Sequence, residues 1–532
     1  MKNNATFLAY QQTGFFSKLV ADYVSAAEEL KPFYKYPVSV DGIKAAIQSR
    51  QSVTTNRQLL VNELINQYQN IALTEKQVAY LEALKSDTTF TITTAHQPNI
   101  FTGPLYFIYK IIHAIKLADE LKKELPEYNF VPVYYMGSED ADLDELGHIN
   151  LGGEKLVWQT KQVGAVGRML VDKPLLQMIT SIQGQVGVHP FGNELVALFG
   201  QCYTLGKTIQ QATLELVNAL FASYGLLIII PDNPNLKASF NRVVAKELTE
   251  QFSHKAVAET IKNLSQHYKV QAGGRDLNLF YLIGDKRERI EVVNSHFEIS
   301  NLQLNWTQEE ILSELQNHPE RFSANVILRG VFQETILPNI AFIGGGGELA
   351  YWLELKQVFE AANVPYPMLV LRNSFLFIQQ YQIEKIQKMG FEIADFFKKE
   401  LILVNDLVQK KSTKQLSLTN EIKEVNTFYD NLKNTIALIN NTLAQHTEAL
   451  RTKALKPLFE LEKKMLRAEK RHFTDQQQQI AKLKNNLFPN NSLQERTENF
   501  STYYAEYGKD WLQLIYNQSL TLQQQFTVVK LP

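Results

Sequence analysis

The 532-residue chain is too long for one compact hydrophobic core, so its length predicts two or three domains. Its formal net charge of −1 gives no electrostatic reason to expect nucleic acid or an anionic membrane surface as a partner. A single cysteine, Cys202, excludes an intrachain disulfide and a thiolate-rich metal site. The N-terminal sequence lacks a signal-peptide pattern, and no apolar run approaches about 18 residues, so we expect a cytoplasmic protein.

Five short apolar segments each end in a polar or glycine-rich loop that leads into a helical pattern. They are "TFTITTA" before His96, "FVPVYYM" before Gly137, "GLLIII" before Pro231, "NIAFI" before Gly344 and "MLVL" before Arg372. Strands of this length, separated by helical periodicity, predict parallel βαβ units. We therefore predict an α/β fold with a doubly wound parallel sheet over residues 1–375, whose five loops meet at the carboxyl edge.

Two long intervals predict excursions from this sheet, at roughly residues 147–200 and 255–325. The first contains a glycine pair, Gly152 and Gly153, between stretches rich in β-formers. The second alternates around Gly284 and Asp285 in the manner of a β-hairpin. We expect both excursions to be small subdomains that cover the ligand site.

Beyond residue 375 the composition changes, and we predict an α-helical coiled-coil domain over 376–515 and a tail over 516–532 that packs on the core. Apolar residues recur at the spacing of a coiled-coil seam at Leu432, Ile436, Ile439 and Leu443, and at Leu458, Leu461, Met465 and Ala468. The pattern breaks either at Asn440 with Asn441 or at Lys456 with Pro457, and both alternatives remain open. Such a seam favours an arm for dimerisation.

The loop after the first predicted strand provides candidate site residues ahead of a helix that begins with Pro104. His96, Gln97 and Thr102 are candidates for catalysis, and Asn99 and Gly103 are candidates for substrate binding. The alternative is a capping turn in which backbone groups satisfy His96.

Carboxylates cluster after the second predicted strand, in "GSEDADLDE". Glu139, Asp140 and Asp142 are candidates to hold Mg²⁺, to position an ammonium group or to act as a general base, and Asp144 and Glu145 follow them. The alternative is an acidic solvated face that complements a helix dipole. The sequence leaves the presence of a metal unknown.

The glycine loop from Gly344 to Gly347 lets the main chain approach a phosphate or carboxylate closely, and Glu348 opens the helix that follows. The loop lacks the lysine of a Walker motif and the spacing of a dinucleotide fingerprint. The alternative is a tight strand-to-helix turn. Asn325 and Arg329 are predicted to reach the same edge as substrate contacts.

Four long stretches carry a family resemblance: "TAHQPNIFTGPLYFIYKII", "VPVYYMGSEDADLDE", "SANVILRGVFQETILPNIAFIGGGGELAYWLELKQVF" and "KLKNNLFPNNSLQERTENF". Together they resemble the bacillithiol-biosynthesis cysteine-adding enzymes, nearly from end to end. The resemblance implies a Rossmann-like core with connecting-peptide insertions and a coiled coil used for homodimerisation. It also implies a ligase that joins cysteine to the amino group of glucosaminyl-malate, the last step of bacillithiol synthesis.

The same resemblance implies a nucleotide pocket, for ADP, at the border between core and coiled coil. Because a carboxylate is a poor acyl donor, we also expect ATP as the activating cofactor, with Mg²⁺ as a candidate ligand of the acidic loop. Arg372, His472, Phe488 and Arg496 are the candidates for that pocket. Two departures limit the transfer: Ala141 stands where the family pattern has a histidine, and the H-x-G-H and K-M-S-K-S signatures of related nucleotidylyltransferases are absent. An adenylating mechanism is therefore not indicated.

Two other functions fit the same sequence features. One is a nucleotidylyltransferase or pantothenate-synthetase-like ligase that acts on another acid and amine. The other is a non-catalytic scaffold whose core binds nucleotide and whose coiled coil recruits a partner.

Overall fold

The computed structural model describes residues 5–531 and divides into two compact units. The first contains most of the chain, chiefly Phe15–Leu376 and Ser492–Val529, and the second contains Phe377–Asn491. The short elements α1 (Tyr10–Thr13) and β15 (Phe375–Ile378) each include residues of both units. The segment Ser492–Val529 follows the helical unit in sequence but packs with the first unit.

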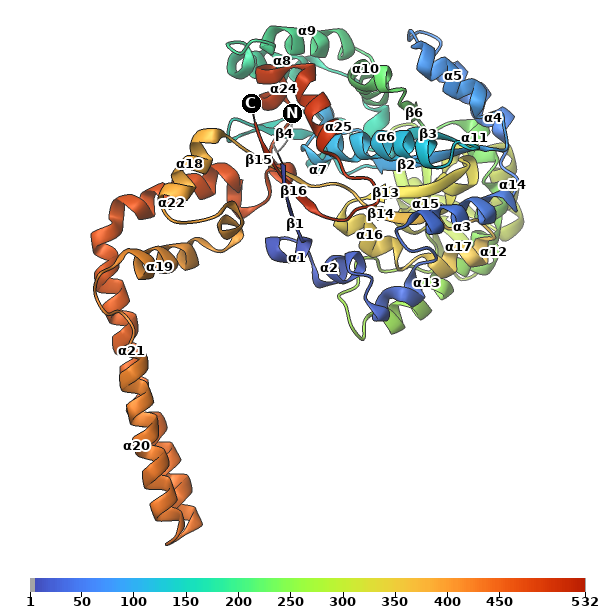
Figure 1. The fold of residues 1–532 in the computed structure, drawn as a ribbon. Coiled ribbons are helices and arrows are strands. Elements are labelled where there is room, and N and C mark those ends of the chain that lie inside the picture. Colours follow the sequence, from blue (N-terminus) through green and yellow to red (C-terminus); the bar gives the residue numbers. More distant parts are fainter. Residues whose placement is uncertain (1–4, 532) are drawn as a thin grey trace. The chain divides into compact units, whose positions relative to one another are not determined.

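A five-stranded parallel sheet forms the centre of the first unit (Figure 1). Its strands are β2 (Thr89–His96), β3 (Asn129–Met136), β6 (Leu227–Ile229), β13 (Asn339–Gly344) and β14 (Met368–Leu371), in the order β14-β13-β2-β3-β6. All five predicted strands are present, which confirms the Rossmann-like, doubly wound sheet. Chain order reverses between β2 and β13, and ligands of such sheets bind at this switch point.

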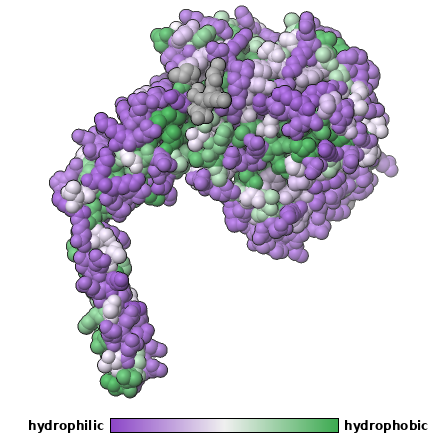
Figure 2. Space-filling view, viewed as in Figure 1, coloured by the Kyte–Doolittle hydropathy of each residue, from purple (hydrophilic) through white to green (hydrophobic). Residues whose placement is uncertain are grey.

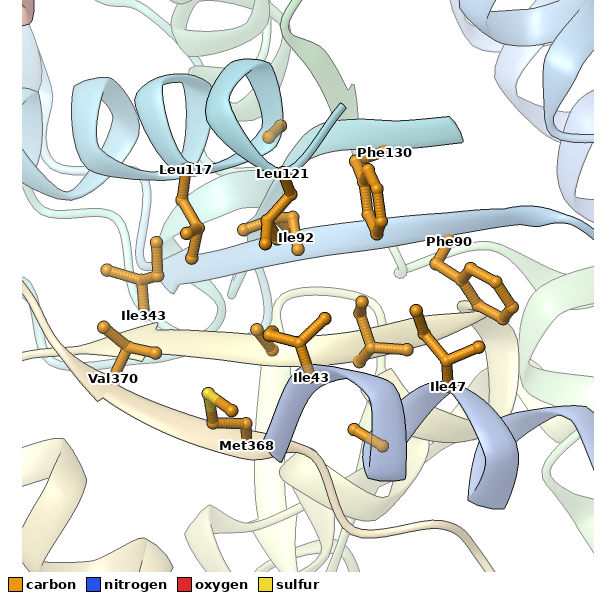
Figure 3. Packing of buried hydrophobic residues seen from close by; sticks show 14 of the residues in the cluster. Ile43, Ile47, Phe90, Ile92, Leu117, Leu121, Phe130, Ile343, Met368 and Val370 are labelled. Atoms are coloured by element: carbon orange, nitrogen blue, oxygen red, sulfur yellow. The ribbon is translucent and has the colours of Figure 1, made fainter. Parts of the chain in front are cut away.

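Helices cover both faces of the sheet and bury its apolar side chains. Helix α6 (Tyr106–Glu124) lies on one face with Leu117 and Leu121 against the strands, and α3 (Val40–Gln51) lies on the other with Ile43 and Ile47 (Figure 3). Every residue of β2 is buried, because helices on both faces exclude water from a parallel sheet. This core holds the strands in place, and with them the loops that follow their carboxyl ends.

Other helices surround these layers. In the first unit they include α2 (Lys18–Val24), α4 (Arg57–Gln67), α5 (Glu75–Ala83), α7 (Leu143–Leu146), α11 (Pro234–Ala238), α12 (Asn241–Glu250), α15 (Val326–Ile336), α16 (Gly346–Trp352), α17 (Lys356–Ala362), α23 (Gln494–Thr497), α24 (Ser501–Tyr507) and α25 (Lys509–Gln518). Near the end of the chain, β16 (Phe526–Lys530) pairs antiparallel with β1 (Ala5–Leu8), so part of the predicted tail adds to a sheet.

The two predicted excursions contain separate small structures. The first holds the hairpin β4 (His148–Leu151) and β5 (Glu154–Val157) with α8 (Lys173–Val186) and α9 (Gly192–Cys202), and α10 (Ile209–Phe221) follows it. The second holds α13 (Phe252–Leu264), β7 (Leu279–Ile283), β8 (Lys286–Arg289), β9 (Glu291–Val293), β10 (His296–Ile299), β11 (Leu304–Trp306), α14 (Gln308–Asn317) and β12 (Phe322–Ala324). Strands β7 and β8 form the predicted hairpin, with Gly284 in its turn at φ 57°.

The second unit is helical, with α18 (Gln380–Lys388), α19 (Glu400–Lys411), α20 (Thr419–Ala437), α21 (Asn441–Lys470) and α22 (Thr474–Leu487). Helices α20 and α21 form an antiparallel hairpin (Figure 1). The Asn440 side chain caps α21 by accepting a hydrogen bond of 2.7 Å from the Thr442 amide, whereas Pro457 lies inside α21. The break is therefore at Asn440, and Ile439 is exposed in the turn rather than continuing a seam.

No helix within residues 5–531 is long and apolar enough to cross a membrane.

The turn after β2 has an unusual backbone and is held by the C-terminal part of the unit. Phe101, Thr102 and Gly103 have successive φ angles of 48°, 68° and 61°, a region that side chains disfavour. Asn499 Nδ2 donates hydrogen bonds of 2.9 Å to the Phe101 carbonyl and 2.6 Å to the Gly103 carbonyl. The Phe101 amide donates to the Tyr203 hydroxyl at 2.9 Å. These buried contacts fix the turn that follows His96.

We predict that Asn499→Ala destabilises the first unit by about 2–3 kcal/mol, because two buried carbonyls lose their donor. Amide hydrogen exchange at residues 101–105 should increase, since the strained turn can then open. Calorimetry and exchange mass spectrometry measure both effects. Asn517→Ala, at an exposed asparagine of α25, is the control and should change stability by less than about 0.5 kcal/mol. Unchanged exchange at the turn in Asn499→Ala would show that Asn499 does not hold it.

Candidate functional site

A cavity of about 990 Å³ opens at the carboxyl edge of the central sheet. Every strand of that sheet contributes the loop at its end: the lining includes His96 after β2, Gly137 after β3, Pro231 after β6, Gly345 after β13 and Arg372 after β14. All lining residues belong to the first unit. The five polar loops predicted from the sequence therefore do converge on one space.

Most of the predicted site residues line this cavity. They are His96, Gln97, Glu139, Asp140, Asn325, Arg329, Gly345, Gly346, Gly347, Glu348, Arg372 and Arg496. The two other nucleotide candidates, His472 and Phe488, belong to the second unit and are not among the lining residues.

Five further predicted site residues do not line the cavity. Asn99, Thr102 and Gly103 are buried in the turn held by Asn499. Asp142 is exposed and caps α7 by accepting a 3.1 Å hydrogen bond from the Glu145 amide, which is the helix-dipole alternative. Gly344 is buried within β13.

His96 presents an uncharged imidazole to the cavity. Burial, together with the nearby charges of Lys110, Arg329 and Arg372, holds the pKa of His96 well below its usual range. Its Nε2 atom is buried and has no hydrogen-bond partner among residues 5–531. A buried ring nitrogen without a partner is available to a ligand that can hydrogen-bond to it.

The acidic loop divides into paired and available carboxylates. Glu139 forms an ion pair with the buried Lys237 and accepts a 3.2 Å hydrogen bond from Ser323 Oγ, so its charge is neutralised within the protein. Asp140 accepts a 3.0 Å hydrogen bond from Gln97 Nε2. Glu145 also lines the cavity, and partial burial, with the charges of Asp142 and Asp140, raises its pKa. Asp140 and Glu145 are thus the carboxylates best placed to meet a ligand.

The glycine loop is braced by an ion pair inside the cavity wall. Lys110 Nζ lies 2.5 Å from Glu348 Oε2 and 2.5 Å from the Ala95 carbonyl, and it is almost fully buried. Glu348 Oε2 also accepts a 2.9 Å hydrogen bond from the Gly345 amide. Glu348 therefore fixes the loop between β13 and α16, which is a structural role that the sequence alone does not separate from substrate binding.

Several cavity residues escaped the sequence analysis. Tyr106 and Lys110 lie in the helix after the first loop, Tyr351 follows the glycine loop, and Arg275, Arg287 and Arg289 lie on or beside the second excursion. The signal for Arg287 and Arg289 was present in the basic run "DKRER" of the predicted hairpin. Only the folded chain shows that the hairpin turns these guanidinium groups toward the site.

The cavity is positive overall but contains an acidic patch. Seven lysine or arginine residues and four aspartate or glutamate residues line it. Such a wall favours anionic ligands, while Asp140 and Glu145 provide a local place for a cation or an amine. Within residues 5–531 no group of three or more His, Cys, Asp or Glu side chains is arranged to hold a metal ion.

A buried ion pair supports the end of β14. Arg372 Nη2 lies 2.8 Å from Glu495 Oε1, and Glu495 also accepts hydrogen bonds from Ser374 Oγ at 3.2 Å and the Phe375 amide at 3.3 Å. A Cβ atom placed on Gly345 would lie 3.5 Å from Arg372 Nε, so this edge of the guanidinium faces the glycine loop. Glu495 thereby sets the position of Arg372 in the cavity wall.

We predict that Arg372→Met destabilises the first unit by about 3–5 kcal/mol, because it leaves the Glu495 carboxylate buried without a counter-ion. The double variant Arg372→Met with Glu495→Gln should recover a large part of that loss. Thermal unfolding of the two variants measures the difference. Equal destabilisation of the single and double variants would show that the ion pair does not carry the effect.

Comparison with known proteins gives matches over almost the whole chain. A family model described as "Bacillithiol biosynthesis BshC, N-terminal Rossmann-like domain" matches residues 3–373, and one described as "Bacillithiol biosynthesis BshC, C-terminal coiled-coil domain" matches 375–531. A protein of Flavobacterium johnsoniae named "Putative cysteine ligase BshC" is 40% identical, over 98% of this chain and 99% of the relative.

Relatives with the same name occur in Flavobacterium psychrophilum, with 38% identity over 98% of this chain and 99% of the relative, and in Christiangramia forsetii, with 38% identity over 98% of each. The same relatives therefore match both the Rossmann-like part and the coiled-coil part of the chain. The chain belongs to the bacillithiol biosynthesis BshC family.

Proposed function

We propose that this protein is the cysteine ligase of bacillithiol biosynthesis, which joins the carboxyl group of cysteine to the amino group of glucosaminyl-malate. The observation that carries the proposal is the cavity at the switch point, where available carboxylates and several guanidinium groups face one space. The carboxylates there complement an amine, and the guanidinium groups complement a negatively charged acid. The name shared by the full-length relatives supports the choice of substrates.

The acidic loop would bind the amine and take up its proton. A protonated amine is attracted to Asp140 and Glu145 but must lose its proton before it can attack a carbonyl carbon. Glu145, whose pKa is raised, is the better proton acceptor of the two, and Asp140 is oriented by Gln97 to hold the amine in place. Attack forms the carbon–nitrogen bond, and the group activating the cysteine carboxylate leaves with its oxygen.

His96 would contact the acyl group during this step. Its ring stays neutral beside Lys110, Arg329 and Arg372, so it acts through a hydrogen bond rather than through charge. Arg329, which donates a 2.6 Å hydrogen bond to the Tyr351 hydroxyl, lies in the same wall and provides fixed positive charge. Preorganised donors of this kind stabilise negative charge that develops on a carbonyl oxygen.

Activation of the carboxylate belongs to the same proposal, with ATP supplying the leaving group when it is bound. The loop at Gly346 and Gly347 fits an anionic group: a Cβ atom on Gly347 would meet nothing within 4 Å, and Arg372 and Arg496 line the same cavity. Any Mg²⁺ would enter with the nucleotide phosphates, which provide oxygen ligands. The pocket for ADP assigned to Arg372, His472, Phe488 and Arg496 stays a prediction from the family resemblance. Cytoplasmic location stays a prediction from the sequence.

We predict that cells lacking this gene lose bacillithiol and accumulate glucosaminyl-malate, as measured by bimane labelling and mass spectrometry. The wild-type gene should restore the thiol. Asp140→Asn or His96→Ala should lower activity by about 100-fold or more, because each removes a group that meets the reacting atoms. Asp144→Asn is the matched control, since Asp144 lies on the same acidic loop, is exposed and does not line the cavity.

Unchanged bacillithiol in the deletion strain would refute the ligase function. Restoration by the Asp140 and His96 variants, with failure after deletion of the α20–α21 arm, would instead favour the scaffold alternative. Pyrophosphate release by the purified protein with a different acid and amine would favour the other ligase alternative.

We also propose that the protein is a homodimer through the α20–α21 arm. Apolar side chains remain exposed along these helices, among them Phe428, Leu443, Leu450, Phe459 and Leu461. Figure 2 shows hydrophobic surface along this arm and at its end. Residues of this kind on an isolated helical hairpin favour burial against a second copy.

We predict that the wild-type chain sediments as a dimer and that combining Leu450→Glu with Leu461→Glu, which share one face of α21, yields a folded monomer. The charges would have to be buried without partners in the dimer. Lys456→Glu, at an exposed position on another face of the same helix, is the control and should leave the dimer intact. A dimer that survives both glutamates would place the interface elsewhere.

A further inference from the structure

The hairpin β7–β8 presents one basic face to the cavity. In its register Phe280 pairs with Arg289 and Leu282 pairs with Arg287. Side chains alternate along a strand, so Arg287 and Arg289 lie on the same face as Phe280. All three line the cavity, and Arg275, from the segment just before the hairpin, joins them.

The two strand arginines are held in place by neutral groups. The guanidinium carbon of Arg287 lies 3.9 Å from the centre of the Phe280 ring, and that of Arg289 lies 5.5 Å from it. Arg287 also donates hydrogen bonds of 3.3 Å to Ser323 Oγ and 3.4 Å to the Ala324 carbonyl. Stacking and hydrogen bonding orient the planar guanidinium groups before any ligand arrives.

Glu139 and Asp140 act on the charge of Arg287 only from a distance. Within the described part of the chain, no carboxylate forms an ion pair with Arg275, Arg287 or Arg289. By contrast, Lys110 in the same wall pairs with Glu348, and Arg372 pairs with Glu495. The two oriented guanidinium groups, together with Arg275, form a site for anionic groups of a ligand.

We propose that Arg287 and Arg289, assisted by Arg275, bind the two carboxylates of the malyl group of the amine substrate and thereby select it. This inference rests on the proposed function. The side chains of residues i and i+2 leave a strand about 6.6 Å apart, which suits two carboxylates on a short carbon chain better than one phosphate. Each planar guanidinium matches one carboxylate.

The three arginines form a malyl clamp, and its position agrees with the shape of the substrate. In a glucosaminyl compound the amine stands on the sugar carbon next to the one that carries the malyl group, so the two binding sites must be neighbours. Ser323 Oγ connects them: it accepts from Arg287 at 3.3 Å and donates to Glu139 at 3.2 Å. Glu139 directly precedes Asp140, the residue assigned to the amine. One serine therefore separates the malyl clamp from the acidic loop.

The test is calorimetric titration of the purified full-length chain with glucosaminyl-malate, L-malate and methyl glucosaminide. Arg287→Gln and Arg289→Gln should each weaken binding of glucosaminyl-malate and L-malate by about tenfold or more, and leave methyl glucosaminide unchanged. Arg287→Lys should bind these ligands with an affinity between those of the wild type and Arg287→Gln, because lysine keeps the positive charge but lacks the planar guanidinium group.

Lys286→Gln is the matched control. It removes the same charge from the same strand, but Lys286 is exposed and does not line the cavity, so all three ligands should bind as they do to the wild type. If Arg287→Gln fails to fold, Arg289→Gln decides alone, since Arg289 makes no hydrogen bond to β12 within the described residues.

Wild-type affinity for glucosaminyl-malate in both glutamine variants would overturn the clamp. Arginine-dependent binding of inorganic pyrophosphate, with no arginine-dependent binding of L-malate, would overturn it too and mark a phosphate site. Neither result touches the ligase function, which is judged by whether the wild-type gene restores bacillithiol in cells. Loss of that restoration would refute the function itself.

Discussion

The buried ion pair between Arg372 and Glu495 connects the sheet to the part of the chain that returns from the helical unit. Burying two charges costs several kcal/mol each, and their attraction only offsets that cost when the geometry is good. Such a pair therefore contributes little net free energy to the stability of the fold. Here it fixes the end of β14 beside the glycine loop, and it makes the cavity wall depend on residues more than a hundred positions apart.

The same segment also controls the opposite side of the switch point. Asn499 holds the strained turn after β2, four residues beyond the glutamate that holds Arg372. The loops after β2 and β14, which lie on opposite sides of the reversal of chain order, thus have shapes that are imposed from outside the sheet. This explains why a stretch that follows the helical unit in sequence belongs to the first unit in space.

The sequence was sufficient for the sheet and insufficient for the details of its edge. Short apolar runs followed by polar loops predict parallel strands, because burial on both faces leaves no other pattern, and His96 and Arg372 could be placed at strand ends for that reason. Whether Thr102 lines the cavity or is buried depends on Asn499 and Tyr203, which are distant in sequence. The arginines of β8 depend in the same way on how the hairpin folds over the edge.

The acidic loop shows how tertiary contacts assign different tasks to similar side chains. Local sequence makes Glu139, Asp140, Asp142 and Glu145 equivalent, yet Lys237 neutralises the first and the α7 amides engage the third. Only the remaining two keep a carboxylate that faces the cavity without a cationic partner among the described residues. Because only the Ser323 hydroxyl separates the basic hairpin from the acidic loop, a ligand that contacts both regions must carry an amine close to its acidic group. That constraint narrows the chemistry more than the overall charge of the cavity does.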